Sequence, residues 1–116
     1  MFQENKQGEI VTVKVEVPHF TAAVAPHFKR QLGDIAGRGE KYIVVDLAAV
    51  EFIDSTALGA LVSGLKCVAP DGQLAVCNAS ANVDAMLQIT RMDRILKSYP
   101  DEASAREALQ SVAGRR

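Results

Sequence analysis

The residues Asp54-Ser55-Thr56 stand where an apolar run ends and a helical pattern begins. The helical pattern places apolar side chains three and four residues apart, at Leu58, Leu61, Val62 and Leu65. The first turn of a helix leaves backbone N–H groups unpaired, and the helix dipole favours added negative charge there. The sequence therefore predicts that Ser55 is an exposed phosphorylation site that acts as a switch, and that it is not a nucleophile.

A phosphate on Ser55 would add a charge of about −1.5 to −2 beside Asp54. The helix N-terminus stabilises such a charge by roughly 0.3 to 1 kcal/mol, and repulsion from Asp54 offsets part of that gain. A protein docked on this surface would have to desolvate the charge, at a cost that can reach several kcal/mol. Modification is therefore predicted to oppose binding more than folding.

Small uncharged residues follow the Asp-Ser-Thr turn on the side of the helix opposite its leucines. Glycine is a poor choice for an exposed helix surface because it costs about 1 kcal/mol relative to alanine. These residues are predicted to leave a flat surface on which another protein can dock. The predicted partner-binding residues are Asp54, Thr56, Gly59, Ala60, Ser63, Gly64 and, before the preceding helix, Thr21. Helix capping by Asp54, Ser55 or Thr56 is the alternative explanation of the turn.

Other chemistries find little support in the sequence. The two histidines, His19 and His27, lack a triad context or zinc-ligand spacing, and the chain has neither Gly-x-Ser-x-Gly nor a Gly-x-x-x-x-Gly-Lys phosphate loop. Both Cys67 and Cys77 have apolar neighbours and are predicted to be buried and reduced. The prediction is a protein without enzyme activity, metal or cofactor.

Strand and helix patterns alternate along the chain. Strands are predicted at 10–17, 42–47, 73–78 and 95–99, and helices at 21–35, after Ser55, at about 81–89 and after Pro100. Connections too long for hairpins favour an α/β fold with a mainly parallel sheet. Residues 1–116 are predicted to form one domain, with 1–8 and 113–116 flexible.

The overall charge excludes some partners. The net charge is −1 and the pI is about 6.1, so no basic field for nucleic acid is expected. No apolar segment approaches the roughly 20 residues of a membrane span. The expectation is a cytoplasmic protein that does not insert into a membrane.

Three segments together resemble the STAS domain of bacterial anti-sigma factor antagonists, and the similarity covers essentially the whole chain. They are Ile43-Val44-Val45-Asp46-Leu47, Phe52-Ile53-Asp54-Ser55-Thr56-Ala57-Leu58-Gly59 and Gly72-Gln73-Leu74-Ala75-Val76-Cys77-Asn78. The resemblance implies a mixed, mainly parallel sheet of about four strands with interleaved helices. Ser55 matches the phosphoacceptor serine of the family, and Asp54 matches the motif aspartate.

The resemblance also implies partner switching. The unphosphorylated form would bind an anti-sigma factor or kinase-like ATPase, phosphorylation of Ser55 would release it, and a PP2C-type phosphatase would restore binding. The domain is expected to be a monomer or a weak dimer. The chain departs from the family at Pro18-His19-Phe20-Thr21, which replaces a common Gly-x-Leu-Asp. The alternative function is a constitutive STAS subunit of an ABC-type membrane transport complex.

Overall fold

The computed structural model describes residues 1–114 and contains a five-stranded sheet in the order β1-β2-β4-β6-β7. The strands of this sheet are β1 (Phe2–Gln7), β2 (Ile10–Val15), β4 (Tyr42–Asp46), β6 (Gln73–Cys77) and β7 (Lys97–Tyr99). β1 pairs antiparallel with β2, and the other neighbours pair in parallel. The short strands β3 (His19–Phe20) and β5 (Phe52–Ile53) form a separate parallel pair. The predicted mixed, mainly parallel α/β sheet is confirmed, with five strands in place of about four.

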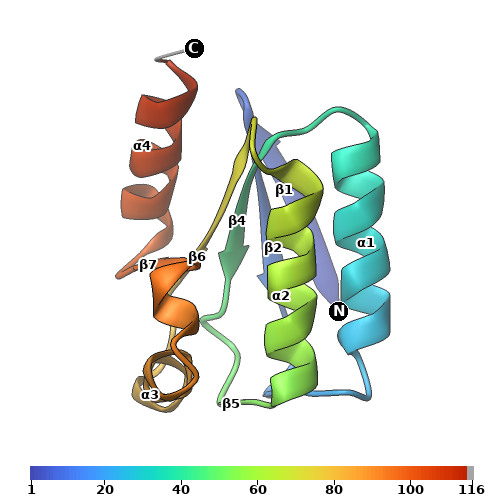
Figure 1. Cartoon of the computed structure of the whole chain (residues 1–116), viewed down its shortest axis with the longest axis vertical. Helices are drawn as coiled ribbons and strands as arrows, with labels where there is room; N and C mark the ends of the chain where they lie inside the picture. The colour runs from blue at the N-terminus through green and yellow to red at the C-terminus, as the bar shows by residue number, and fades with distance from the viewer. Residues whose placement is uncertain (115–116) are drawn as a thin grey trace.

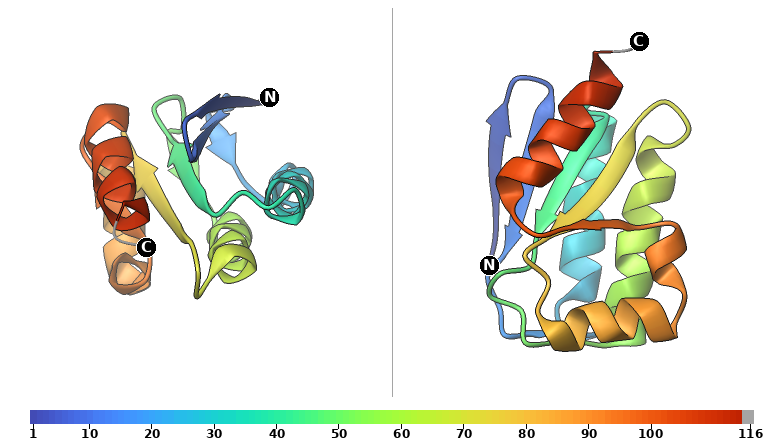
Figure 2. Two further views of the ribbon diagram at one scale, coloured as in Figure 1. Left: turned by 90° about the horizontal axis from the view of Figure 1, so that it is seen from above. Right: turned by 90° about the vertical axis from the view of Figure 1, so that its left-hand side faces the viewer.

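The helices cover both faces of the sheet. They are α1 (Ala25–Gly37), α2 (Ser55–Val68), α3 (Ala81–Ile89) and α4 (Glu102–Ala113), with the short 3-10 helix η1 (Met92–Arg94) after α3. α1 and α2 lie side by side on one face, and α4 packs on the other face (Figure 1 and Figure 2). α3 lies across the end at which the parallel strands finish, and the start of α2 lies at this same end (Figure 1).

Side-chain alternation along the strands builds a core on each side of the sheet. In β4, Ile43 and Val45 face α1 and α2, whereas Tyr42 and Val44 face α4. All four are almost fully buried, as expected for a central strand that is covered on both faces. This rigid centre fixes the position at which the chain leaves β4 and turns toward β5 and α2.

The N-terminal residues form an ordered strand. β1 pairs with β2 along its whole length, and the ring of Phe2 lies 5.3 Å from that of Phe28 in α1. Residues 1–8 were expected to be flexible, whereas the structure places Phe2–Gln7 in a strand, because a tight turn at Gly8, with a positive φ of 61°, folds this polar segment back onto β2. At the other end, where 113–116 were expected to be flexible, Ala113 is the last residue of α4 and is buried. Residues 115–116 lie outside the described part of the chain.

The two cysteines differ from each other. Cys77 is buried in β6 on the side that faces α4, as predicted, but Cys67 is exposed near the end of α2. The prediction of a buried Cys67 is wrong because its neighbours Leu61, Leu65 and Val68 turn inward and leave this position outside.

Candidate functional site

Asp54 joins the start of α2 to the chain before α1. It is the N-cap residue of α2, and its Oδ1 accepts a hydrogen bond of 2.9 Å from the backbone N–H of Ala57. Its Oδ2 accepts a second bond of 3.0 Å from the N–H of Ala22. Both carboxylate oxygens are therefore engaged with backbone donors, and the capping explanation of the turn holds for Asp54.

Ser55 and Thr56 are the first two residues of α2, and both are exposed. Within the described residues, their N–H groups have no hydrogen-bond partner, as expected for a first helical turn. The Ser55 hydroxyl therefore lies in solvent at the positive end of the α2 dipole. An added phosphate would find unpaired N–H groups close by, and a modifying enzyme could reach the oxygen.

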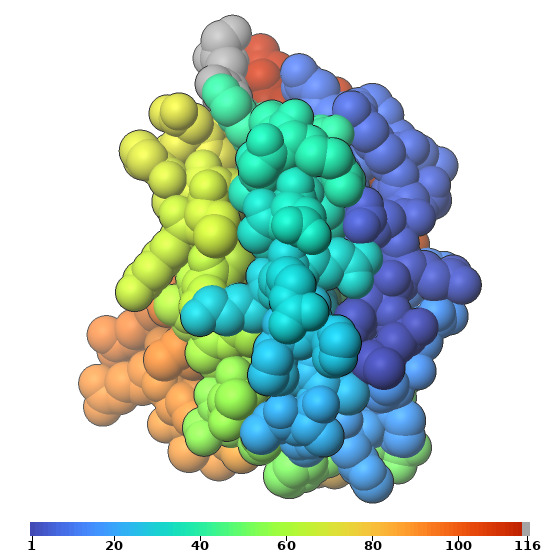
Figure 3. All heavy atoms as spheres, turned by 90° about the vertical axis from the view of Figure 1, so that its right-hand side faces the viewer, coloured from blue at the N-terminus to red at the C-terminus, as the bar shows by residue number. Residues whose placement is uncertain are grey.

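A shallow groove of about 450 Å³ begins beside this turn, between α1 and α2. The α2 side is lined by four of the residues predicted to bind a partner, namely Thr56, Gly59, Ala60 and Ser63. Ala60 is only 4% exposed and forms part of the groove floor. Figure 3 views the face on which α1 lies in the centre, with α2 beside it and β1 on its other side.

The α1 side of the groove was not predicted. It consists of Ala25, Pro26 and Lys29, and Lys29 is the single charged residue of the lining. The signal in the sequence was the spacing of Ala25 and Lys29, which are four residues apart and share one helix face. That spacing does not show which face of α1 packs beside α2, so it could not predict that Ala25 and Lys29 line a groove.

Gly64 and Thr21, both predicted to bind a partner, do not line this groove. Gly64 is buried, and a Cβ atom at this position would collide with Cδ1 of Leu32 and lie 3.1 Å from Cδ1 of Leu74. The prediction that Gly64 belongs to an exposed face is wrong, because α1 packs on that part of α2. Thr21 is half-buried just before α1, where its backbone carbonyl accepts the N–H groups of Val24 and Ala25, and its neighbour Ala22 donates to Asp54.

A second carboxylate near the ends of the parallel strands has a structural role. Asp46 at the end of β4 is 7% exposed, and its Oδ1 accepts 3.0 Å hydrogen bonds from the N–H of Ala48 and from Nδ2 of Asn78. These bonds tie the ends of β4 and β6 together. The Asp46 carboxylate is therefore already engaged in holding the sheet together.

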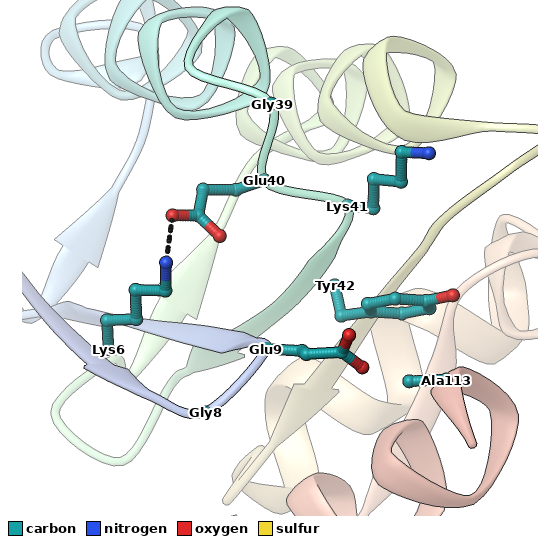
Figure 4. Close-up of a pocket in the computed structure, with 8 residues that line it drawn as sticks. All are labelled: Lys6, Gly8, Glu9, Gly39, Glu40, Lys41, Tyr42 and Ala113. Atoms are coloured by element: carbon teal, nitrogen blue, oxygen red, sulfur yellow. Dashed lines mark ion pairs between the residues drawn. The ribbon is translucent and has the colours of Figure 1, made fainter.

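A larger hollow, of about 500 Å³, lies at the opposite end of the sheet from Ser55. The charged side chains that line it are two lysines and two glutamates, so their charges cancel. Figure 4 shows Lys6 beside Glu40, with which it forms a 2.8 Å ion pair, and Glu9 and Lys41 in the same lining. This arrangement favours no particular ligand. The small-residue groove beside Ser55 is therefore the candidate functional site.

Residues 1–114 contain neither a metal-binding cluster nor a membrane span. No cluster of three or more histidine, cysteine, aspartate or glutamate side chains is placed to bind a metal ion. Among these residues, every helix is too short or too polar to cross a bilayer.

Comparisons with known proteins agree with this geometry. The STAS domain model matches residues 2–105. The anti-sigma factor antagonist TM1081 homolog of Thermotoga neapolitana is 40% identical over 90 residues, which is 76% of this chain and 77% of the relative. The anti-sigma F factor antagonist of Paenibacillus polymyxa is 26% identical over 106 residues, which is 90% of this chain and 88% of the relative.

Solved structures show the same architecture. The crystal structure of an anti-sigma factor antagonist from Thermotoga maritima has a TM-score of 0.88 at 28% identity and covers 94% of each chain. The phosphorylated form of the Bacillus protein SpoIIAA (TM-score 0.71, 14% identity, 93% of this chain and 99% of that chain) shares the fold. A sulfate transporter family protein from Wolinella succinogenes also shares it, with a TM-score of 0.78 at 18% identity over 91% of this chain and 88% of that chain. The fold, the Asp-Ser-Thr turn and these matches agree, and the chain belongs to the STAS domain family.

Proposed function

We propose that this protein is an anti-sigma factor antagonist whose partner binding is switched by phosphorylation of Ser55. In the unphosphorylated form the groove between α1 and α2 binds an anti-sigma factor or a kinase-like ATPase. That kinase phosphorylates Ser55 and dissociates the complex, and a PP2C-type phosphatase reverses the modification. The observation that carries the proposal is the exposed Ser55 hydroxyl at the start of α2, next to a groove of small residues.

The structure supports a switch that spares the fold. Because both oxygens of Asp54 accept backbone hydrogen bonds, part of the charge of this carboxylate is already compensated where the phosphate would be added. The N-terminus of α2 stabilises the phosphate by roughly 0.3 to 1 kcal/mol. A partner that covers Ser55 must instead remove a doubly charged group from water, and this costs several kcal/mol when no cation meets it.

The relatives support the same role. Two proteins that match most of the chain are named as antagonists of an anti-sigma factor, and one of them is 40% identical. The phosphorylated SpoIIAA structure and the transporter protein show only that one fold accommodates both classes of protein. The groove beside an accessible hydroxyl favours the switch over the constitutive transporter subunit.

The experiment compares Ser55→Ala, Ser55→Asp and the unmodified protein against purified anti-sigma kinases of the source organism, with and without ATP. Ser55→Ala should keep the kinase bound in the presence of ATP, because no phosphate can form. Ser55→Asp should bind weakly even without ATP. Mass spectrometry of the unmodified protein should place the phosphate on the Ser55 peptide.

The matched control is Ser104→Ala, which removes a serine from the first turn of another helix, α4. This variant should behave like the unmodified protein in every arm of the experiment. Equal recovery of the kinase by all Ser55 variants would reject the switch. Such a result would favour the constitutive STAS subunit, in which Ser55 is only a helix-start residue.

A further inference from the structure

β1 is the outermost strand of the sheet, and its outer edge is open beyond Phe2. It pairs with β2 on one side only, and no described strand lies beyond it (Figure 2). Its residues from Gln3 to Gln7 are all exposed. A strand with an open edge presents a row of N–H and C=O groups to which another strand can pair.

The pairing with β2 determines which backbone groups face outward. The N–H of Glu16 donates to the carbonyl of Met1, so the odd-numbered residues of β1 exchange hydrogen bonds with β2. The even-numbered residues, Phe2, Glu4 and Lys6, therefore direct their backbone groups away from the sheet. Consistent with this, the carbonyl of Phe2 accepts a bond from the Gln31 side chain. Among the described residues, the outward groups of Glu4 and Lys6 have no such partner.

The charges of β1 are self-complementary in one antiparallel register. When Asn5 of one copy lies opposite Asn5 of a second copy, Glu4 of each copy lies opposite Lys6 of the other. A shift of one residue pair in either direction instead places Glu4 opposite Glu4, or Lys6 opposite Lys6, and like charges directly opposite each other are destabilising. In the Asn5-centred register each Glu4–Lys6 pair can also exchange both of its backbone hydrogen bonds.

Both charged side chains are already held in place by partners within their own chain. Arg38 donates a 2.8 Å bond to Glu4, and Lys6 forms a 2.8 Å ion pair with Glu40, which Figure 4 shows. Pairing of two copies would therefore create a row of alternating charges, Arg38–Glu4 of one copy followed by Lys6–Glu40 of the other. A network of this kind stabilises more than isolated surface pairs do, and the fixed side chains lose little further entropy.

We propose that β1 is a homodimerisation edge, at which two copies of this chain join their sheets antiparallel with Asn5 opposite Asn5. The interface is formed by one short polar strand per copy, so the dimer is weak and depends on protein concentration. The β1 edge is separate from the Ser55 groove, and dimerisation does not depend on the proposed switch.

Cysteine cross-linking tests the register directly. In a Cys67→Ser background, Asn5→Cys places two thiols opposite each other in a pair without backbone hydrogen bonds, where Cα atoms are about 4.5 Å apart and a disulfide fits. Mild oxidation should convert this variant to a covalent dimer. Gln3→Cys and Gln7→Cys are the matched controls, because each lies roughly 13 Å from its own counterpart in this register. They should cross-link at least about fivefold more slowly alone, and a mixture of the two should cross-link readily.

A charge-reversal variant provides a second test of the same register. Lys6→Glu in the Asn5→Cys background places a second carboxylate opposite Glu4 and should suppress cross-linking, whereas Lys14→Glu, on the neighbouring strand β2, should leave it unchanged. Equal cross-linking at positions 3, 5 and 7 would show random collision and overturn the proposal. Analytical ultracentrifugation that finds only the monomer at protein concentrations up to about 1 mM would also overturn it.

Discussion

Asp54 has two structural roles at the residue scale. One oxygen caps α2 through Ala57, and the other holds the N–H of Ala22 in the segment that leads into α1. A single side chain therefore fixes both walls of the groove at the end nearest Ser55. This is the physical reason why an aspartate precedes the serine, in addition to any contact that it makes with a partner.

Asp54→Ala is predicted to lower the free energy of unfolding by about 1–2 kcal/mol, because a cap is lost and a second N–H loses its acceptor. Urea denaturation followed by circular dichroism measures this loss. The matched control is Asp101→Ala, which removes the N-cap of α4 but only one backbone hydrogen bond. An equal loss in the two variants would show that the bond to Ala22 contributes nothing.

At the scale of elements, α2 has two faces with opposite tolerance for larger side chains. Gly64 lies against Leu32 and Leu74, whereas nothing lies within 4 Å of a Cβ atom added at Gly59. The two glycines are five residues apart on one helix and therefore form a matched pair for substitution.

Gly64→Ala is predicted to destabilise the fold by about 1–3 kcal/mol, because the added methyl group forces Leu32 to move. Gly59→Ala should stabilise the fold by up to about 1 kcal/mol, since alanine is the better helix former and meets no neighbour. Thermal or urea unfolding of both variants checks the contrast. Similar stability changes for the two would mean that the packing of α1 against α2 differs from that described.

The element patterns show what the sequence could and could not predict. The alternation in Ile10–Val15, the buried run at Tyr42–Asp46 and the leucine spacing in α2 predicted β2, β4 and α2, and with them the turn at Ser55. β1 was missed because Phe2–Gln7 is almost entirely polar and gains its order from pairing with β2. Gly64 was misplaced because a small residue is compatible with an exposed face and equally with a close helix–helix contact, and spacing within one helix does not distinguish them.

At the scale of the whole molecule, the sheet carries a buried thiol between β6 and α4. Burial raises the pKa of the Cys77 thiol to about 12, and the carboxylates of Asp46 and Glu102 act in the same direction. In the unfolded chain this thiol ionises near its ordinary value of 9.0. Above that pH the folded state holds more protons than the unfolded state, so the free energy of unfolding falls as pH rises.

The predicted pH window for this loss runs from about 9 to about 12. Cys77→Ala should flatten the fall in stability over that range, although the variant starts from a lower stability because a buried side chain is truncated. The free energy of unfolding is measured with urea at a series of pH values for both proteins, and the difference between them isolates the contribution of this thiol. Parallel curves for the two proteins would contradict a buried, neutral Cys77.

The separate positions of the hydroxyl and the core would allow the proposed switch to change partner binding without changing the fold. Ser55 is exposed at the end of the sheet where the parallel strands finish, whereas the two hydrophobic clusters lie along the length of the sheet. A charge added at Ser55 therefore enters neither cluster. Stability and partner binding should respond to phosphorylation as two separate quantities.

The most direct measurement uses protein with phosphoserine incorporated at position 55 and the kinase identified by the ATP-dependent assay. Calorimetry should show binding to that kinase weakened by about a hundredfold or more relative to the unmodified protein, which is ~2.7 kcal/mol. The thermal midpoint of the two forms should agree within about 4 °C, which corresponds to a change of less than 1 kcal/mol in a domain of this size. Equal affinity of the two forms, or unfolding of the phosphorylated one, would contradict the account.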